Sequence, residues 1–145
     1  MNNRYICKAK RKDNGEWVTG YYVFRRKRSG IFGQIISELD FDRHLIIDLR
    51  GNSHEVIPET VVRCTGLDDK NGKWIFEGDV FEGNKIDGKK KLYKFWYDDE
   101  NGGFVYGTSY KSGYRLSIAK WCFSAKNIEV IGNIHDNPEL LEAER

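Results

Sequence analysis

Short runs of apolar and aromatic residues, separated by turn residues, recur along the chain and predict a mostly β protein. The first two runs, residues 5–10 and 16–24, are joined by Asp13-Asn14-Gly15, a turn sequence that favours positive φ and indicates a hairpin. Gly20, inside the second run, is a candidate β-bulge. The remaining predicted strands are residues 44–49, 54–57, 78–83, 91–97, 104–106 and 128–134. Strands this short, with few helical periods between them, indicate a barrel or a sandwich.

One short helix is predicted near the C-terminus. Asn137 is a candidate N-cap, Pro138 suits the first helical position, and Glu139 lies near the positive end of the helix dipole. The helix is expected to run from Pro138 to about Glu144.

The composition is that of a folded domain. Of 145 residues, 39% are hydrophobic and 14% aromatic, and 24 basic side chains nearly balance 22 acidic ones. This excludes a disordered polyelectrolyte. The charge is uneven, since the first 30 residues hold nine Lys or Arg and only two acidic residues. No run reaches the length of a membrane helix, and the start lacks the apolar core of a signal peptide, so no membrane partner and a cytoplasmic location are expected.

Cysteine and histidine spacing indicates neither a metal site nor a cofactor. The three cysteines are far apart with no CxxC pair, and the three histidines lack ligand spacing, so the thiols are expected to be free and buried. These residues are Cys7, Cys64, Cys122, His44, His54 and His135.

Two segments carry a resemblance to a known family. Residues 65–80 read TGLDDKNGKWIFEGDV, and residues 128–141 read IEVIGNIHDNPELL. Together with IPETV at residues 57–61, they are similar to the YopX family of bacteriophage and prophage proteins. The likeness covers residues 57–141, and nothing is carried over to the first 56 residues.

The resemblance implies a phage or prophage context in a bacterial host cell, an SH3-type β-barrel in the C-terminal part, and no catalytic residues. With the strand pattern it predicts an all-β fold with an N-terminal β lobe, residues 1–62, and an SH3-like barrel with a terminal helix, residues 63–145. Pro58 ends the strand before this boundary because it lacks a backbone donor.

The residues of the similar segments are interpreted as turn architecture. We expect Gly66, Gly72 and Gly78 to stabilise turns, with at least one at positive φ, and Asp79 to accept bonds from local N–H groups. The alternative is that Glu77 and Asp79, two apart on a strand, form a general acid/base pair. The full set is Gly66, Asn71, Gly72, Glu77, Gly78, Asp79, Gly132, Asn137 and Pro138.

The aromatic residues allow two interpretations. They are either core and cross-strand pairs, as in most small β proteins, or stacking platforms for single-stranded nucleic acid. Within residues 92–97, Tyr93, Phe95 and Tyr97 share one face and are expected to be buried. Lys94 and Trp96 share the other, which could contact a partner. The residues in question are Trp17, Tyr21, Tyr22, Phe24, Tyr93, Phe95, Trp96, Tyr97, Phe104 and Tyr106.

Two basic runs are candidate contacts for an anionic partner. The first is Arg25, Arg26, Lys27 and Arg28, and the second is Lys89, Lys90 and Lys91. The first run could also be a solvated loop, or could pair with the acidic stretch Glu38, Asp40, Asp42 and Asp48.

The sequence therefore predicts a non-enzymatic accessory protein that binds a macromolecule. The alternative is a nucleic-acid-binding protein that uses the basic N-terminal lobe. A small enzyme is the third hypothesis, which no motif supports, and no small-molecule substrate is expected. A homo-oligomer is predicted, because self-association through the N-terminal hairpin would cover an exposed sheet edge.

Overall fold

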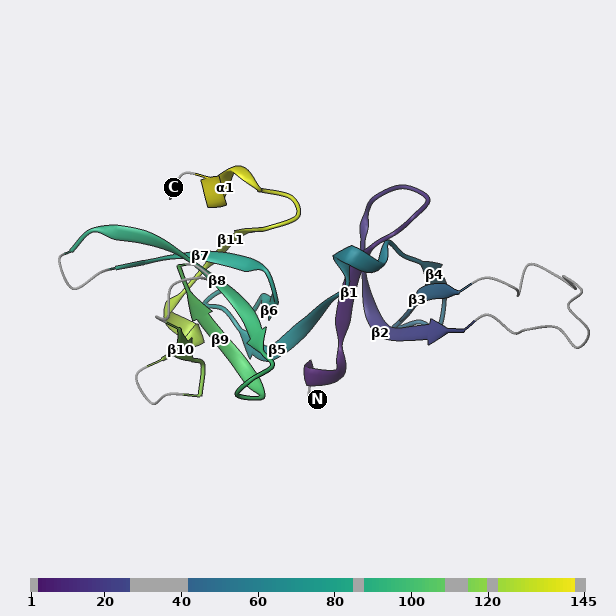
Figure 1. The fold of residues 1–145 in the computed structure, drawn as a ribbon, viewed down its shortest axis with the longest axis horizontal. Coiled ribbons are helices and arrows are strands. Elements are labelled where there is room, and N and C mark those ends of the chain that lie inside the picture. The colour runs from purple at the N-terminus through teal and green to yellow at the C-terminus, as the bar shows by residue number, and fades with distance from the viewer. Residues whose placement is uncertain (1–2, 27–41, 85–87, 109–114, 120–122, 143–145) are drawn as a thin grey trace, which may run out of the picture. The chain divides into compact units, whose positions relative to one another are not determined.

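The computed structural model describes residues 3–26, 42–84, 88–108, 115–119 and 123–142. These residues form a mostly β protein with two antiparallel sheets (Figure 1). The chain divides into two compact units, one of Tyr5–Arg63 and one of Cys64–Arg145 with Met1–Arg4.

The N-terminal unit is built from consecutive antiparallel strands. Its hydrogen-bonded order is β4-β3-β2-β1, followed by the first residues of β5, which pair with β1. The predicted Asn-Gly hairpin joins β1 to β2, with Gly15 at a φ of 72°. The strands are β1 (Cys7–Lys10), β2 (Trp17–Arg25), β3 (Arg43–Asp48), β4 (Ser53–Glu55) and β5 (Val62–Asp68).

One face of this sheet carries the core of the unit. Ala9, Ile46 and Val56 are buried there, and Cys7, Val18 and Val61 pack against them. The alternation of side chains along β1 and β2 produces this face, since Ala9 pairs with Val18 across the hairpin.

Gly20 is not a bulge. The pairing of β2 is regular on both sides, with Gly20 opposite Cys7 in β1 and Asp48 in β3, so the bulge prediction is wrong. A glycine is needed for a different reason. A Cβ atom at this position would lie 2.0 Å from the carbonyl oxygen of Ile47 in β3.

Pro58 begins a 3-10 turn, Pro58–Thr60, after the strand that it was expected to end. The buried Thr60 links this turn to β1, because its Oγ1 accepts a hydrogen bond from Lys10 N–H (2.8 Å) and donates one to Ile57 O (2.7 Å).

The C-terminal unit contains the second sheet, in the order β10-β9-β8-β7-β11, and a hairpin between the end of β5 and β6. Among the described residues the sheet does not close into a barrel, so the mostly β class is confirmed while the SH3-like barrel stays a prediction. The elements are β6 (Trp74–Phe76), β7 (Asp79–Asn84), β8 (Lys90–Asp98), β9 (Gly103–Gly107), β10 (Leu116–Ser117), β11 (Val130–Asn133) and α1 (Glu139–Glu142).

An aromatic cluster forms the core of the C-terminal unit. Phe81 and Phe95 are buried with ring centroids 5.1 Å apart, and Tyr93 and Tyr106 pack against them. The core interpretation of Tyr93 and Phe95 is therefore confirmed. Lys94, by contrast, is only 7% exposed, so the prediction that it lies on an open face is wrong.

The two family-like segments meet in this unit. Asp69 lies in the turn between β5 and β6, and its Oδ2 accepts a hydrogen bond from Val130 N–H in β11 (3.1 Å). Beside it, Lys70 N–H donates to Ile128 O (2.9 Å). Ile134 N–H donates to the carbonyl oxygen of Gly78 (2.9 Å). Backbone and side-chain hydrogen bonds thus connect residues 65–80 to residues 128–141, and we call this contact the joint between the two segments.

The prediction that at least one of three glycines has positive φ is confirmed. Gly66, Gly72 and Gly78 have φ values of 83°, 76° and 78°. Gly66 differs from the expected turn, since it lies in β5 where the register with β6 shifts. At Gly72, where an added Cβ would meet no atom within 4 Å, conformation alone should decide the effect of a substitution.

We therefore expect Gly72→Ala to lower the free energy of unfolding by about 1 kcal/mol, because alanine is strained at positive φ. Gly72→Asn should lose less, since asparagine tolerates this conformation. Thermal melts of the two variants check the prediction, and an alanine variant as stable as the parent protein would contradict it.

The predicted N-cap of α1 is wrong in one respect. The Asn137 carbonyl accepts the Leu140 N–H (3.1 Å), as expected at a helix start. The Asn137 side chain instead accepts a hydrogen bond from Asn133 N–H in β11 (3.3 Å). Gly132 permits this, because a Cβ there would lie 2.5 Å from Asn137 Oδ1.

Candidate functional site

The second face of the N-terminal sheet combines basic and aromatic side chains. Because paired residues of antiparallel strands share a face, the register places this set opposite the core residues Ala9, Val18 and Ile46. We call it the outer face, and define it by Lys8 and Lys10 of β1, Trp17, Tyr21 and Arg25 of β2, and Arg43 of β3.

Trp17 lies between two lysines on this face. Lys10 is its direct partner across the hairpin, and Lys8 is the diagonal neighbour. The Lys8 and Lys10 ammonium nitrogens lie 4.9 Å and 5.5 Å from the centroid of the Trp17 ring. Both distances fall within the range of a cation–π interaction. The sequence signal for this arrangement is the Lys-x-Lys spacing in β1, which meets Trp17 only through the register of the hairpin.

The second half of β2 exposes large apolar side chains on both faces. Tyr21, Tyr22, Val23 and Phe24 are 43%, 37%, 38% and 44% exposed. Tyr22 and Phe24 lie on the core side of the sheet, beside His44 of β3. Each face of this end of β2 thus exposes two large apolar side chains, and exposed apolar side chains that lie together mark interaction sites.

His44 organises the aromatic side chains on the core side. Its Nδ1 is hydrogen-bonded to the Tyr22 hydroxyl at 2.6 Å, and its ring centroid lies 4.9 Å from that of Phe24. Partial burial, and after it the neighbouring Cys7, raise the pKa of Tyr22, so the hydroxyl keeps its proton at neutral pH.

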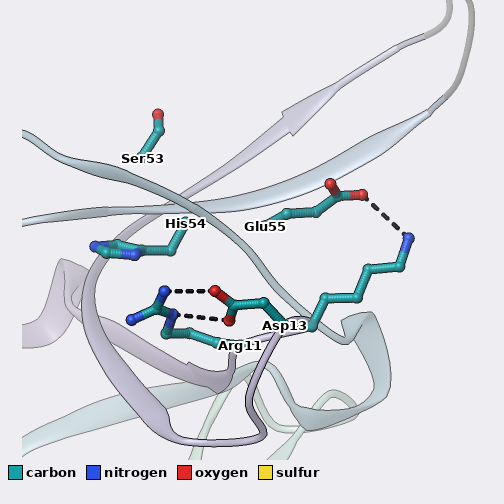
Figure 2. A pocket seen from close by; sticks show the side chains of 6 residues that line it. Arg11, Asp13, Ser53, His54 and Glu55 are labelled. Atoms are coloured by element: carbon teal, nitrogen blue, oxygen red, sulfur yellow. Dashed lines mark hydrogen bonds and ion pairs between the residues drawn. The ribbon is translucent and has the colours of Figure 1, made fainter. Parts of the chain in front are cut away.

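A pocket of about 270 Å³ lies where the β1–β2 turn meets β4 (Figure 2). Figure 2 shows the Arg11 guanidinium facing the Asp13 carboxylate. The two hydrogen bonds between them measure 3.0 Å and 2.6 Å, and the Lys12 ammonium pairs with the Glu55 carboxylate at 3.2 Å. The Arg11 hydrogen bond lowers the pKa of Asp13, and those from Lys12 and then Arg43 lower the pKa of Glu55. The charged groups of the wall therefore pair with one another.

His54, which also lines this pocket, is hydrogen-bonded to Asp48 at 2.8 Å. The same carboxylate accepts the backbone N–H groups of Arg50 and Asn52, both at 2.9 Å. The bond to His54, followed by that from Asn52, lowers the pKa of Asp48. Asp48 therefore holds its own loop, which argues against a pairing with residues 25–28.

The predicted anion contacts fall in different units. Arg25 and Arg26 are exposed at the end of β2, while Lys27 and Arg28 lie outside the described residues, as do Glu38 and Asp40. Lys89, Lys90 and Lys91 lie at the start of β8, where Lys90 pairs with Glu82 at 3.2 Å.

Two more of the predicted residues make hydrogen bonds through their side chains. Asp79 is buried, and its Oδ2 accepts a hydrogen bond from Phe76 N–H (2.8 Å), so its expected local role is confirmed. Asn71 donates from its amide to Glu129 Oε1 (3.2 Å).

Cys64 is a buried free thiol, as predicted, whereas Cys7 is half-buried and Cys122 lies outside the described residues. Within the described ranges, no group of three or more His, Cys, Asp or Glu residues could hold a metal ion. In the same ranges no helix is both long and apolar enough to cross a membrane.

Comparison with known proteins decides the family. The family model described as YopX protein matches residues 8–142. The chain belongs to the YopX family. The match begins in β1, so the YopX likeness includes the N-terminal unit, beyond the segments in which we recognised it.

Two further comparisons accompany the YopX match. Among solved structures, the chain is similar to the crystal structure of protein EF1440 from Enterococcus faecalis. The two share 21% sequence identity and a TM-score of 0.47, over 93% of this chain and 96% of the other. A search of curated proteins found no match.

Proposed function

We propose that this protein is a non-enzymatic phage or prophage accessory protein that acts in the bacterial cytoplasm by binding a macromolecule through its N-terminal unit. Membership of the YopX family supports the context. The observation that carries the binding role is the exposed half of β2, where Tyr21, Tyr22, Val23 and Phe24 are each more than a third exposed.

Nucleic acid is the alternative partner to a protein. The exposed Arg25 and Arg26 directly follow the apolar stretch of β2, so a partner seated there would meet positive charge. A second copy of the chain is also proposed as a partner, through the N-terminal hairpin. β1 pairs with β2 only over residues 17–20, so among the described strands residues 21–25 of β2 pair with β3 alone, and their other edge is one that a second copy could cover.

Affinity capture from host cells carrying the induced phage or prophage tests the binding role. Half of each lysate is treated with nuclease. The parent protein should retain a partner that Val23→Ser/Phe24→Ser loses, because the pair removes apolar side chains from both faces of β2.

Ile131→Ser is the matched control, since Ile131 is an exposed apolar residue of β11 in the other unit. It should keep the partner. Capture of nothing in either half of the lysate, or equal capture by both variants, would contradict the proposal. Sedimentation of the purified protein checks self-association separately.

A further inference from the structure

The outer face of the N-terminal sheet carries two aromatic side chains on the same strand, β2. Trp17 and Tyr21 are four residues apart on β2 and therefore lie on the same side of the sheet, about 13 Å apart. Tyr21 is 43% exposed, and Trp17 is half-buried beneath the lysine side chains of β1. A base has a flat apolar surface that stacks on such rings, so two bases of one strand can stack on the two side chains.

Cationic side chains flank the two aromatic residues on the outer face. Lys8 and Lys10 adjoin Trp17, while Arg25 and Arg43 are direct partners across β2 and β3, beyond Tyr21. Two like charges directly opposite on adjacent strands disfavour the pair. Glu55 offsets part of this, because it lies 3.2 Å from Arg43. A bound phosphate would neutralise the rest.

We propose that the outer face binds single-stranded nucleic acid, with bases stacked on Trp17 and Tyr21 and phosphates bound by Lys8, Lys10 and Arg25. This proposal rests on the proposed function and names its partner. Cation–π pairs at the surface are weak, so a base replaces an ammonium on the Trp17 ring while the ammonium moves to the adjacent phosphate.

The aromatic pair favours single strands over the other partners. In a duplex the bases are stacked on each other and paired, so only the cations of the outer face would make contact. An acidic protein surface would likewise satisfy the cations and leave the two rings without a matching flat surface. Unpaired bases are the ligand that uses both kinds of side chain.

Fluorescence anisotropy with labelled oligothymidylate of 20 nucleotides, and with a duplex of the same length, tests the proposal in the full chain. The single strand should bind more tightly than the duplex at low salt. Trp17→Ala and Tyr21→Ala should each weaken binding by about 5- to 150-fold, the loss expected for one stacked base.

An aromatic residue outside β2 supplies a matched control. Tyr5 is 75% exposed and lies in the 3-10 turn Asn3–Tyr5 before β1, so Tyr5→Ala should leave the affinity unchanged. Lys8→Gln/Lys10→Gln should reduce the slope of log K against log salt by about 1.4, at about 0.7 per phosphate contact on a single strand. Trp17→Phe should keep most of the affinity, and it carries the test if Trp17→Ala does not fold.

Several outcomes overturn the inference. These are no binding of either oligonucleotide at low salt, equal affinity for the duplex, or equal losses in Tyr21→Ala and Tyr5→Ala. Capture of a protein that survives nuclease and is lost in Val23→Ser/Phe24→Ser would overturn this inference while supporting the proposed function. If the protein captures no partner and binds no oligonucleotide, the inference and the proposed function are both contradicted.

Discussion

Asp69→Ala should lower the free energy of unfolding of the C-terminal unit by about 4 kcal/mol. The Asp69 carboxylate is 1% exposed and accepts hydrogen bonds from the backbone N–H groups of Asn71 (2.9 Å), Lys73 (3.0 Å) and Val130 (3.1 Å). Alanine would leave these donors without their acceptor, and a buried donor without a partner is costly. Urea unfolding followed by tryptophan fluorescence measures the effect.

The neighbouring Asp68 provides the control. Its carboxylate pairs with Lys126 at 3.1 Å on the surface, where such pairs contribute little. Asp68→Ala should therefore change stability by less than about 1 kcal/mol. Similar losses in the two variants would show that Asp69 is not the joint between the β5–β6 turn and β11.

The same residue should give stability a pH dependence. Burial opposes ionisation of Asp69, but the hydrogen bonds from Val130, Lys73 and Asn71 outweigh it and lower its pKa below the ordinary 3.8. The stabilisation is therefore complete above the pKa of the unfolded chain. It is lost as the pH falls toward the lower pKa of the folded protein. In Asp69→Asn, the free energy of unfolding should therefore depend less on pH in the acid range.

Gly20→Ala should prevent the N-terminal sheet from forming or lower the free energy of unfolding by about 3 kcal/mol or more. The added Cβ would lie 2.0 Å from Ile47 O and 2.7 Å from Ile47 C, both backbone atoms of a paired strand. Backbone in the middle of a sheet cannot move aside as a flexible side chain can, so β2 and β3 would have to separate.

Gly103→Ala is the matched control for Gly20→Ala. Gly103 also lies at a paired position of a strand, but no atom lies within 4 Å of its added Cβ. Circular dichroism and thermal melts should show a nearly unchanged protein. A Gly20→Ala variant as stable as Gly103→Ala would refute the close approach between β2 and β3.

Local chemistry made part of the fold predictable from sequence. The Asn14-Gly15 turn, the aromatic core around Phe95 and the positive φ of Gly72 depend on neighbouring residues or on strand alternation, and the structure has all three. The role of Gly20 depends on the Ile47 backbone of another strand, so local sequence suggested only a bulge.

In the candidate site, too, local sequence predicted the kinds of residue present but not the contacts between strands. The sequence indicated aromatic and basic residues in the first 30 positions, but the pairing of Lys8 and Lys10 with Trp17 depends on the hairpin register. Asn137 failed as a predicted side-chain cap because its side-chain oxygen accepts the Asn133 N–H of β11, a donor that the local sequence of the helix does not reveal. Lys94 alternates with core residues, yet it is only 7% exposed at a position of β8 that pairs with Val80 of β7 and Gly107 of β9.

The joint between the two family-like segments has a consequence for synthesis on the ribosome. Every residue that pairs within the N-terminal unit has been made once Arg63 has been added, whereas Asp69 lies 61 residues before Val130, whose N–H group donates a hydrogen bond to it. Until Val130 has been added, the Asp69 carboxylate of the nascent chain lacks this donor, and the edge of β7 that pairs with β11 is exposed. Substitutions in residues 128–134 should therefore reduce the yield of folded protein during translation more than its affinity for a partner.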